Sequence, residues 1–381
     1  MMVMIFVNDV GGVKGLPWWT YHIDHLGPHA NGMTYVDVVF PTFLFVVGMA
    51  IPLAIRRRLE RGDSTPRLWG HILMRSLSLV VLGLILANTE RVDPKLTHLS
   101  AGTWGAVAVI GAILFWAVYP KNDRQTLWRV LKYTGLAILI LALAIFRTTN
   151  RAGEVTWLNF GYWEILGLIG RAYLAACILY FPVRKWIWAP PAIFAALTAL
   201  NVATRMGMPP VDTFIPYALW PFDSGEHPSI VFAGIIAWSI FFHPRAARTL
   251  ERKTAVALGF AAILFAGGWA FSFLGISKNE ATPTWCLYSS AIGVTLFTAL
   301  YWICDVRGWR SWAAFVKPAG SNTLLTYLLP DLFYFTIGAT ATYEALVPHT
   351  GWPGVVGAIV FTGFILGVSW ALTRKNIRMQ L

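Results

Sequence analysis

The chain has 381 residues, of which 57% are hydrophobic and only 13% are charged. Soluble domains carry about 25% charged residues, so this chain has too few to cover a water-soluble fold of its size. Its net charge of +12 could point to nucleic acid, but a basic excess in a membrane protein usually reflects topology. Soluble enzymes, nucleic-acid-binding proteins and disulfide scaffolds are therefore excluded.

The hydrophobic residues occur in long runs, and about 20 apolar residues in a helix cross a hydrocarbon core of about 30 Å. The sequence predicts an all-α, polytopic membrane bundle with about eleven full transmembrane helices. In chain order, they are expected at residues 36–55, 70–88, 103–119, 130–146, 164–182, 186–203, 228–243, 254–274, 285–303, 316–336 and 353–373. Residues 1–7 are expected to be the outer end of a truncated N-terminal helix. No internal repeat or linker divides the chain, so residues 1–381 are expected to form a single transmembrane domain.

Lysines and arginines divide unequally between the two sets of loops. One set holds 21 of the 30 basic residues and includes Arg56, Arg57 and Arg58, whereas the other holds 7. Since cytoplasmic loops carry an excess of Lys and Arg, the first set is predicted to be cytoplasmic. The second set, which begins with residues 8–35, is predicted to face outward.

The first outer loop is the densest polar segment, and it contains His22, His25 and His29. A histidine can deprotonate an amine or hydroxyl nucleophile, or carry an acyl group itself. The alternative is a solvated loop in which the histidines occur by chance. Their spacing would suit a metal site on one helix face, but Gly27 and Pro28 intervene, so no metal is expected.

Two charged residues in apolar surroundings each have two interpretations. Asp37 opens the first full span, where it could cap the helix or orient a histidine as carboxylates do in catalytic triads. Arg171 lies inside the run 164–182, where it could snorkel or pair with Glu164, or bind a phosphate or carboxylate.

The most specific motif of the chain is the run Gly-Met-Thr-Tyr-Val-Asp-Val-Val-Phe-Pro at residues 32–41. Through this run the chain resembles the heparan-α-glucosaminide N-acetyltransferase family. Further matching segments, in the family's order, are residues 6–8, 18–22, 42–48, 163–170, 277–279, 282–285, 288–289, 305–308 and 318–325.

The resemblance implies a transmembrane acyltransferase, with acetyl-CoA as co-substrate on the cytosolic side. The acyl group, expected to be acetyl, would reach an amine or hydroxyl of a sugar-like acceptor on the outer side. The family's proposed catalytic histidine follows an Asn and a Trp, and these match His22, Asn8 and Trp18 here. Asp37 would complete the catalytic set.

His25 and His29 bracket the family's usual spacing to Asp37 and stay as alternates for the catalytic histidine. The expected substrate-binding residues are Trp18, Lys278, Asn279, Thr282, Trp285, Asn322 and Arg171. The cytoplasmic arginines either contact the phosphates of the donor or only set topology; they are Arg56, Arg57, Arg58, Arg245, Arg248 and Arg310.

The resemblance to bacterial members of the family implies a multi-pass protein of the bacterial inner membrane, with its active-site loop facing the periplasm, and it makes a homodimer a reasonable expectation. The alternative function is a multi-pass transporter of a small polar solute, whose path the same residues would line.

Overall fold

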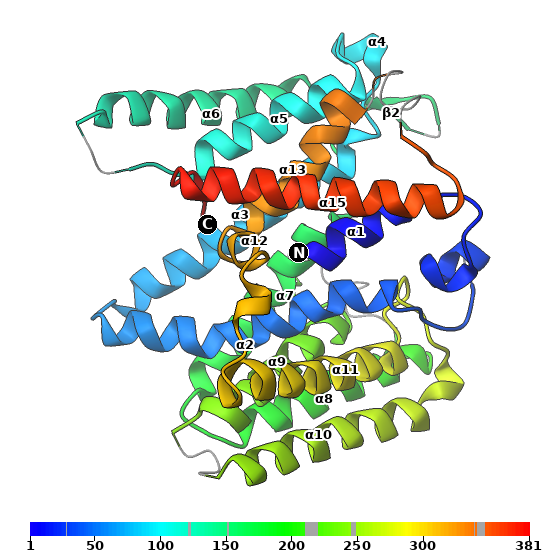
Figure 1. The fold of residues 1–381 in the computed structure, drawn as a ribbon, viewed down its shortest axis with the longest axis vertical. Helices are drawn as coiled ribbons and strands as arrows, with labels where there is room; N and C mark the ends of the chain where they lie inside the picture. Colours follow the sequence, from blue (N-terminus) through cyan, green and yellow to red (C-terminus); the bar gives the residue numbers. More distant parts are fainter. Residues whose placement is uncertain are drawn as a thin grey trace. The chain divides into compact units, whose positions relative to one another are not determined.

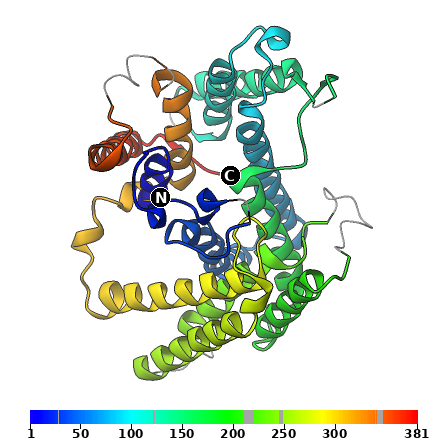
Figure 2. The same ribbon diagram turned by 90° about the vertical axis from the view of Figure 1, so that its right-hand side faces the viewer.

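The computed structural model describes most of the chain, namely residues 1–27, 29–120, 123–150, 152–209, 220–244, 249–338, 340 and 347–381. Helices dominate these residues, and the strands among them are two residues long (Figures 1 and 2). The described chain forms two compact units. Unit 1 contains Met1–Pro17, Val80–Gly167 and Ser311–Leu381, and unit 2 contains Trp18–Leu79 and Leu168–Arg310. The all-α class is confirmed, and the single domain stays a prediction.

Seven of the described helical segments are long and apolar enough to cross a bilayer. They are Val36–Glu60, Thr65–Thr89, Gln125–Ile145, Glu164–Val183, Leu250–Ala270, Pro283–Val306 and Gly351–Arg374. Two shorter apolar helices are α5 (Ala101–Trp116) and α9 (Glu226–Phe242). The multi-pass membrane character is therefore confirmed, whereas the count of eleven is not.

Unit 2 is built around α9, of which 13 of the 17 residues are buried. This helix packs against α2 (Val39–Glu60), α8 (Ala189–Arg205), α10 (Leu250–Ala270) and α11 (Pro283–Tyr301), which lie alongside it in Figure 1. The unit also contains parts of α3 (Thr65–Thr89) and α7 (Glu164–Val183), the π-helix η7 (Trp302–Val306), and the 3₁₀-helices η1 (Trp18–Thr20), η2 (Ile23–Leu26), η3 (Val36–Val38) and η6 (Ser272–Leu274).

The backbones of α2 and α9 touch where glycines face each other. A Cβ atom added at Gly48 would overlap the carbonyl oxygen of Val231, and one added at Gly234 would overlap that of Phe45. Helices in membranes use small residues for such close approach, because apolar side chains gain nothing from leaving lipid. The pairing of these two helices therefore depends on Gly48 and Gly234.

Unit 1 contains α1 (Met2–Val10), which packs on α15 (Gly351–Arg374), and the hairpin of α5 and α6 (Gln125–Ile145). Its other elements are α4 (Pro94–Thr97), α12 (Lys317–Ser321), α13 (Thr323–Phe333), the 3₁₀-helix η8 (Ser311–Ala313) and the π-helix η9 (Tyr334–Gly338). Strand β1 (Ala117–Val118) pairs antiparallel with β4 (Arg378–Met379), and β2 (Thr148–Thr149) with β3 (Val155–Thr156).

The span predicted at residues 316–336 is not one continuous α-helix. The chain leaves the helical conformation at Asn322, where φ is −127° and ψ is 48°, and α12 and α13 lie on either side. The Asn322 side chain donates hydrogen bonds to the Thr373 hydroxyl at 3.1 Å and the Ile377 carbonyl at 3.0 Å, and accepts one from the Met379 amide. At this break, the side-chain amide of Asn322 binds the C-terminal tail.

Several helices extend beyond their apolar runs. Helix α2 continues to Glu60, so Arg56, Arg57 and Arg58, which the sequence analysis placed in a loop, are helical, and the following α3 begins at Thr65. Hydropathy marks the part of a helix that contacts lipid, whereas Arg, Leu and Glu favour helix in water as well.

Candidate active site

The side chain of Asp37 organises the first outer loop. It is 1% exposed, and its Oδ1 lies 2.6 Å from Nδ1 of His22. Its Oδ2 accepts hydrogen bonds from the backbone N–H groups of Thr34 at 2.9 Å and Ile23 at 3.1 Å. Asp37 therefore orients His22. Its carboxylate accepts hydrogen bonds from N–H groups of the loop and does not cap α2, whose N-cap residue is Val38.

Residues of helix α11 form hydrogen bonds that fix the backbone at Asp37. Trp285 is fully buried, and its indole N–H donates to the backbone carbonyl of Asp37 at 3.3 Å. Thr282 is the N-cap of α11, and its hydroxyl accepts from the N–H of Trp285. These two predicted substrate-binding residues thus hold the backbone at Asp37 in place, because their polar atoms bind protein groups.

Lys278 lies against the ring of His22. Its Nζ is 3.2 Å from Nδ1 and 3.4 Å from Nε2. Because the Asp37 carboxylate accepts from Nδ1, Nδ1 carries the proton in the neutral imidazole and Nε2 is the basic nitrogen. Burial lowers the pKa of Lys278 from its ordinary value, while the negative charges of Asp37 and Asp24 act in the opposite direction.

Three further hydrogen bonds connect the loop before α11 to the first outer loop. The Asn279 side chain donates to the carboxylate of Asp24 at 2.9 Å. Ile276 donates its N–H to the Asn31 side chain at 2.7 Å and accepts from the N–H of Gly32 at 2.9 Å. The backbone of Lys278 is thus held beside His22 by contacts of Ile276 before it and of Asn279 after it.

The other loop residues named from the sequence have different surroundings. His25 is exposed, and its ring stacks on Tyr21 with centroids 4.3 Å apart. His29 is exposed, and so is 54% of Trp18. Among the three histidines, the carboxylate of Asp37 thus contacts His22.

Two predicted site residues belong to unit 1, whereas His22 belongs to unit 2. Asn8 is exposed on α1. Asn322 is 1% exposed and binds the C-terminal tail. A role of either residue in the reaction stays a prediction.

The partner of Arg171 was not anticipated. Its Nη2 lies 2.6 Å from Oδ1 of Asp223 and donates to the carbonyl of Trp220 at 2.7 Å. Arg171 is 3% exposed and the Asp223 side chain 7%. Asp223 lies far along the chain from Arg171, so no helical spacing indicated this pair. The guanidinium is thus held by a carboxylate of its own unit.

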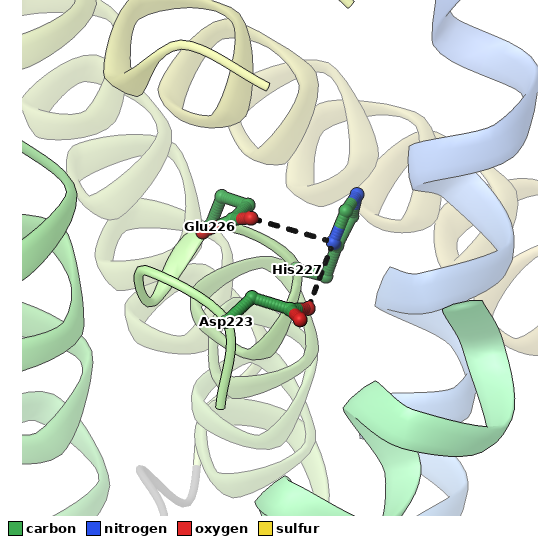
Figure 3. A group of neighbouring side chains, drawn as sticks. All are labelled: Asp223, Glu226 and His227. Carbon is green, nitrogen blue, oxygen red and sulfur yellow. Dashed lines mark hydrogen bonds and ion pairs between the residues drawn. The ribbon is translucent and has the colours of Figure 1, made fainter. Parts of the chain in front are cut away.

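Asp223 also belongs to a polar cluster with Glu226 and His227 (Figure 3). Nδ1 of His227 lies 3.3 Å from Oδ2 of Asp223 and 3.9 Å from Oε1 of Glu226. One ligand atom from each residue could approach a metal ion, but Arg171 already places a positive charge on Asp223. The cluster is therefore described as an ion-pair network, and the expectation of no metal stays a prediction.

A cavity of about 280 Å³ lies at the other end of α2 from Asp37. Its lining includes the basic residues Arg56 and Arg184 and the aromatic rings of Tyr180, Trp238 and His243. Since α2 has 22 residues and a helix rises 1.5 Å per residue, about 33 Å separates its two ends. Of the predicted donor contacts, Arg56 lines this cavity, Arg310 pairs with Asp305, and Arg245 and Arg248 lie outside the described residues.

Comparison with known proteins supports the resemblance. Heparan-alpha-glucosaminide N-acetyltransferase of Mus musculus is 38% identical over 133 residues, which cover 32% of this chain and 19% of that protein. The Homo sapiens protein of the same name is 39% identical over 88 residues, which cover 23% of this chain and 12% of the relative. The matched segments thus span less than a fifth of either relative.

A family model described as a domain of unknown function, DUF5009, matches residues 1–211. These residues include His22, Asp37 and Arg171 and exclude Lys278. Because the match extends over more than half of the chain, the protein belongs to the DUF5009 family.

Proposed function

We propose that the protein is an integral-membrane acyltransferase that moves an acetyl group from cytosolic acetyl-CoA to an amine or hydroxyl of a sugar-like acceptor on the outer side. The observation that carries the proposal is the contact of His22 with the buried carboxylate of Asp37, which makes Nε2 a positioned base. The resemblance to two N-acetyltransferases supports acyl transfer as the reaction.

In this mechanism, the nitrogen or oxygen of the acceptor attacks the thioester carbonyl while Nε2 of His22 removes the acceptor's proton. The C–S bond breaks, and the imidazolium returns the proton to the CoA thiolate that leaves. Asp37 keeps the imidazole in the required tautomer and stabilises the imidazolium that forms. Lys278 and Asn279 border the acceptor, and the exposed ring of Trp18 offers a surface for a sugar. Thr282 and Trp285 act by positioning Asp37.

The donor is proposed to enter from the cytoplasmic side, past the cavity that contains Arg56 and Arg184, and to react with its thioester placed beside His22. Guanidinium groups suit the phosphates of CoA, and aromatic rings suit a stacked base. We further propose eleven membrane crossings with the histidine loop outside, and a location in the bacterial inner membrane, as a homodimer.

The decisive experiment measures free CoA thiol released from acetyl-CoA by the protein in detergent, with and without an amino sugar. We expect acceptor-dependent release that His22→Ala abolishes, while His25→Ala and His29→Ala retain it. Thiol release that is unchanged in His22→Ala would overturn the assignment of the base. Accumulation of a labelled solute by sealed vesicles without an acyl donor would instead favour the transporter.

The orientation has its own test. In a Cys304→Ser background, the exposed positions His29 and Arg61 are each changed to cysteine and treated with a membrane-impermeant thiol reagent. We expect His29→Cys to react in cells whose inner membrane is intact, and Arg61→Cys only after lysis. The reverse pattern would contradict the proposed topology.

A further inference from the structure

The side-chain amine of Lys278 lies over the imidazole ring of His22, the proposed general base. Its Nζ lies 3.4 Å from Nε2 of His22, close to the distance at which a base takes a proton in an unliganded site. The contact with Nδ1, at 3.2 Å, cannot be an accepting interaction, because Nδ1 donates its proton to Asp37. Because Nζ is nearly equidistant from the two ring nitrogens, it lies over the face of the imidazole, and rotation of the flexible lysine side chain would bring it in line with Nε2.

The surroundings of Lys278 favour an amine that is both held and reactive. It is half-buried, and the neighbouring contacts of Asn279 with Asp24 and of Ile276 with Asn31 anchor its segment. Burial lowers its pKa despite the attraction of Asp37 and Asp24, so a larger share of it is neutral near pH 7 than for a fully solvated lysine. Only the neutral amine is a nucleophile.

We infer that Lys278 is a self-acetylation site: when acetyl-CoA is bound and no acceptor is present, the active site transfers the acetyl group to Lys278. This inference rests on the proposed function, because it uses the same donor and the same base. The acceptor normally displaces the Lys278 amine from His22, and in its absence the lysine reacts in its place.

The step balances without another reactant. The neutral amine of Lys278 attacks the thioester carbonyl, a C–N bond forms, the C–S bond breaks, and CoA leaves as the thiolate. Nε2 of His22 takes the proton lost from the nitrogen and returns it to the thiolate. The product is an amide, which is stable, uncharged and bulkier than the amine, so it blocks the space beside His22 and limits the enzyme's own activity.

The test incubates the full-length protein in detergent with acetyl-CoA alone and maps acetylated lysines by peptide mass spectrometry. Lys95, which is exposed in another predicted outer loop, serves as the internal reference for uncatalysed acetylation. We expect Lys278 to be acetylated at least about tenfold faster than Lys95 and an amino sugar to suppress the reaction. His22→Ala should slow it by roughly 100-fold, since positioned bases contribute about 10²–10⁴. Acetylation that is equally fast in His22→Ala would overturn the inference, because simple chemical reactivity would then explain it.

A second arm measures function. Preincubation with acetyl-CoA should inactivate the wild type, whereas Lys278→Arg, normalised to its own activity without preincubation, should resist inactivation. Hydroxylamine should not remove the label, whereas it would remove an acyl group from histidine. Acceptor-dependent thiol release that requires His22, without acetyl-Lys278, would overturn this inference and leave the proposed function intact. Absence of any His22-dependent thiol release would overturn both.

Discussion

The imidazole of His22 and the carboxylate of Asp37 lie fifteen positions apart in sequence and meet at 2.6 Å between Nδ1 and Oδ1. The carboxylate is almost inaccessible, while 37% of the histidine side chain is exposed. One partner is therefore held by the protein, and the other remains open to a substrate.

Asp37→Asn should test whether this contact sets the tautomer of His22. The amide can still contact the ring, but it does not require a proton on Nδ1 and cannot stabilise an imidazolium, so we expect acceptor-dependent thiol release to fall by roughly 10²–10⁴-fold. Asp24→Asn is the matched control, because Asp24 binds Asn279 and not His22. Equal losses in the two variants would argue for a general effect on the loop instead.

Lys278 should react with an amine-directed acylating reagent at lower pH than the exposed Lys95. Burial lowers the pKa of Lys278, so the neutral amine becomes abundant at a lower pH. The charge of Asp37 raises this pKa, and its removal in Asp37→Asn should move the reactivity to still lower pH. Peptide mass spectrometry across a pH series gives both profiles, and a Lys278 profile above that of Lys95 would contradict the described environment.

The lowered pKa of Lys278 also predicts how its contribution to the free energy of unfolding changes with pH. The unfolded chain binds more protons at Lys278 than the folded one between the lowered pKa and the ordinary value of 10.5. The contribution of this residue to folding free energy should thus become more favourable as pH rises through that window.

Arg171→Ala should destabilise unit 2 strongly. It leaves Asp223 buried without its counter-charge, and removal of one partner from a buried pair costs about 3–5 kcal/mol. Arg310→Ala breaks an exposed pair with Asp305 and should cost about 0–1 kcal/mol. Thermal unfolding in detergent compares the two variants, and a similar melting temperature for both would contradict the buried ion pair.

Gly48→Ala should disrupt the contact of α2 with α9, because the new Cβ overlaps the carbonyl oxygen of Val231. Such overpacking costs typically about 1–3 kcal/mol. Gly259→Ala on α10 is the control, since nothing lies within 4 Å of its Cβ position and alanine favours helix more than glycine. The melting temperature should fall for the first change and stay level or rise for the second.

The sequence predicted the helical class and most helix positions, and it offered the pairing of Asp37 with a histidine as one of two interpretations. These follow from local signals, namely apolar run length, charge bias, and an acid close in sequence to the histidines. The choice of His22 depends on the three-dimensional path of the loop, because the hydrogen bonds from Thr34 and Ile23 turn the carboxylate toward His22.

Other features had no local signal. Lys278 meets His22 across 256 positions, and Arg171 meets Asp223 from a different segment. Charge bias predicts that Lys278 and His22 lie on the same side of the membrane, but not that they touch. The break at Asn322 was also missed, and the tail that its side chain binds lies 55 residues further along the chain.

That tail has a practical consequence for engineering. Ile377 and Met379 are bound by Asn322, and Met379 pairs with Ala117, so the last residues connect the break between α12 and α13 to strand β1. A reporter or affinity tag inserted before Leu381 would disrupt these contacts of the tail. A tag joined after Leu381 by a flexible spacer would leave them intact.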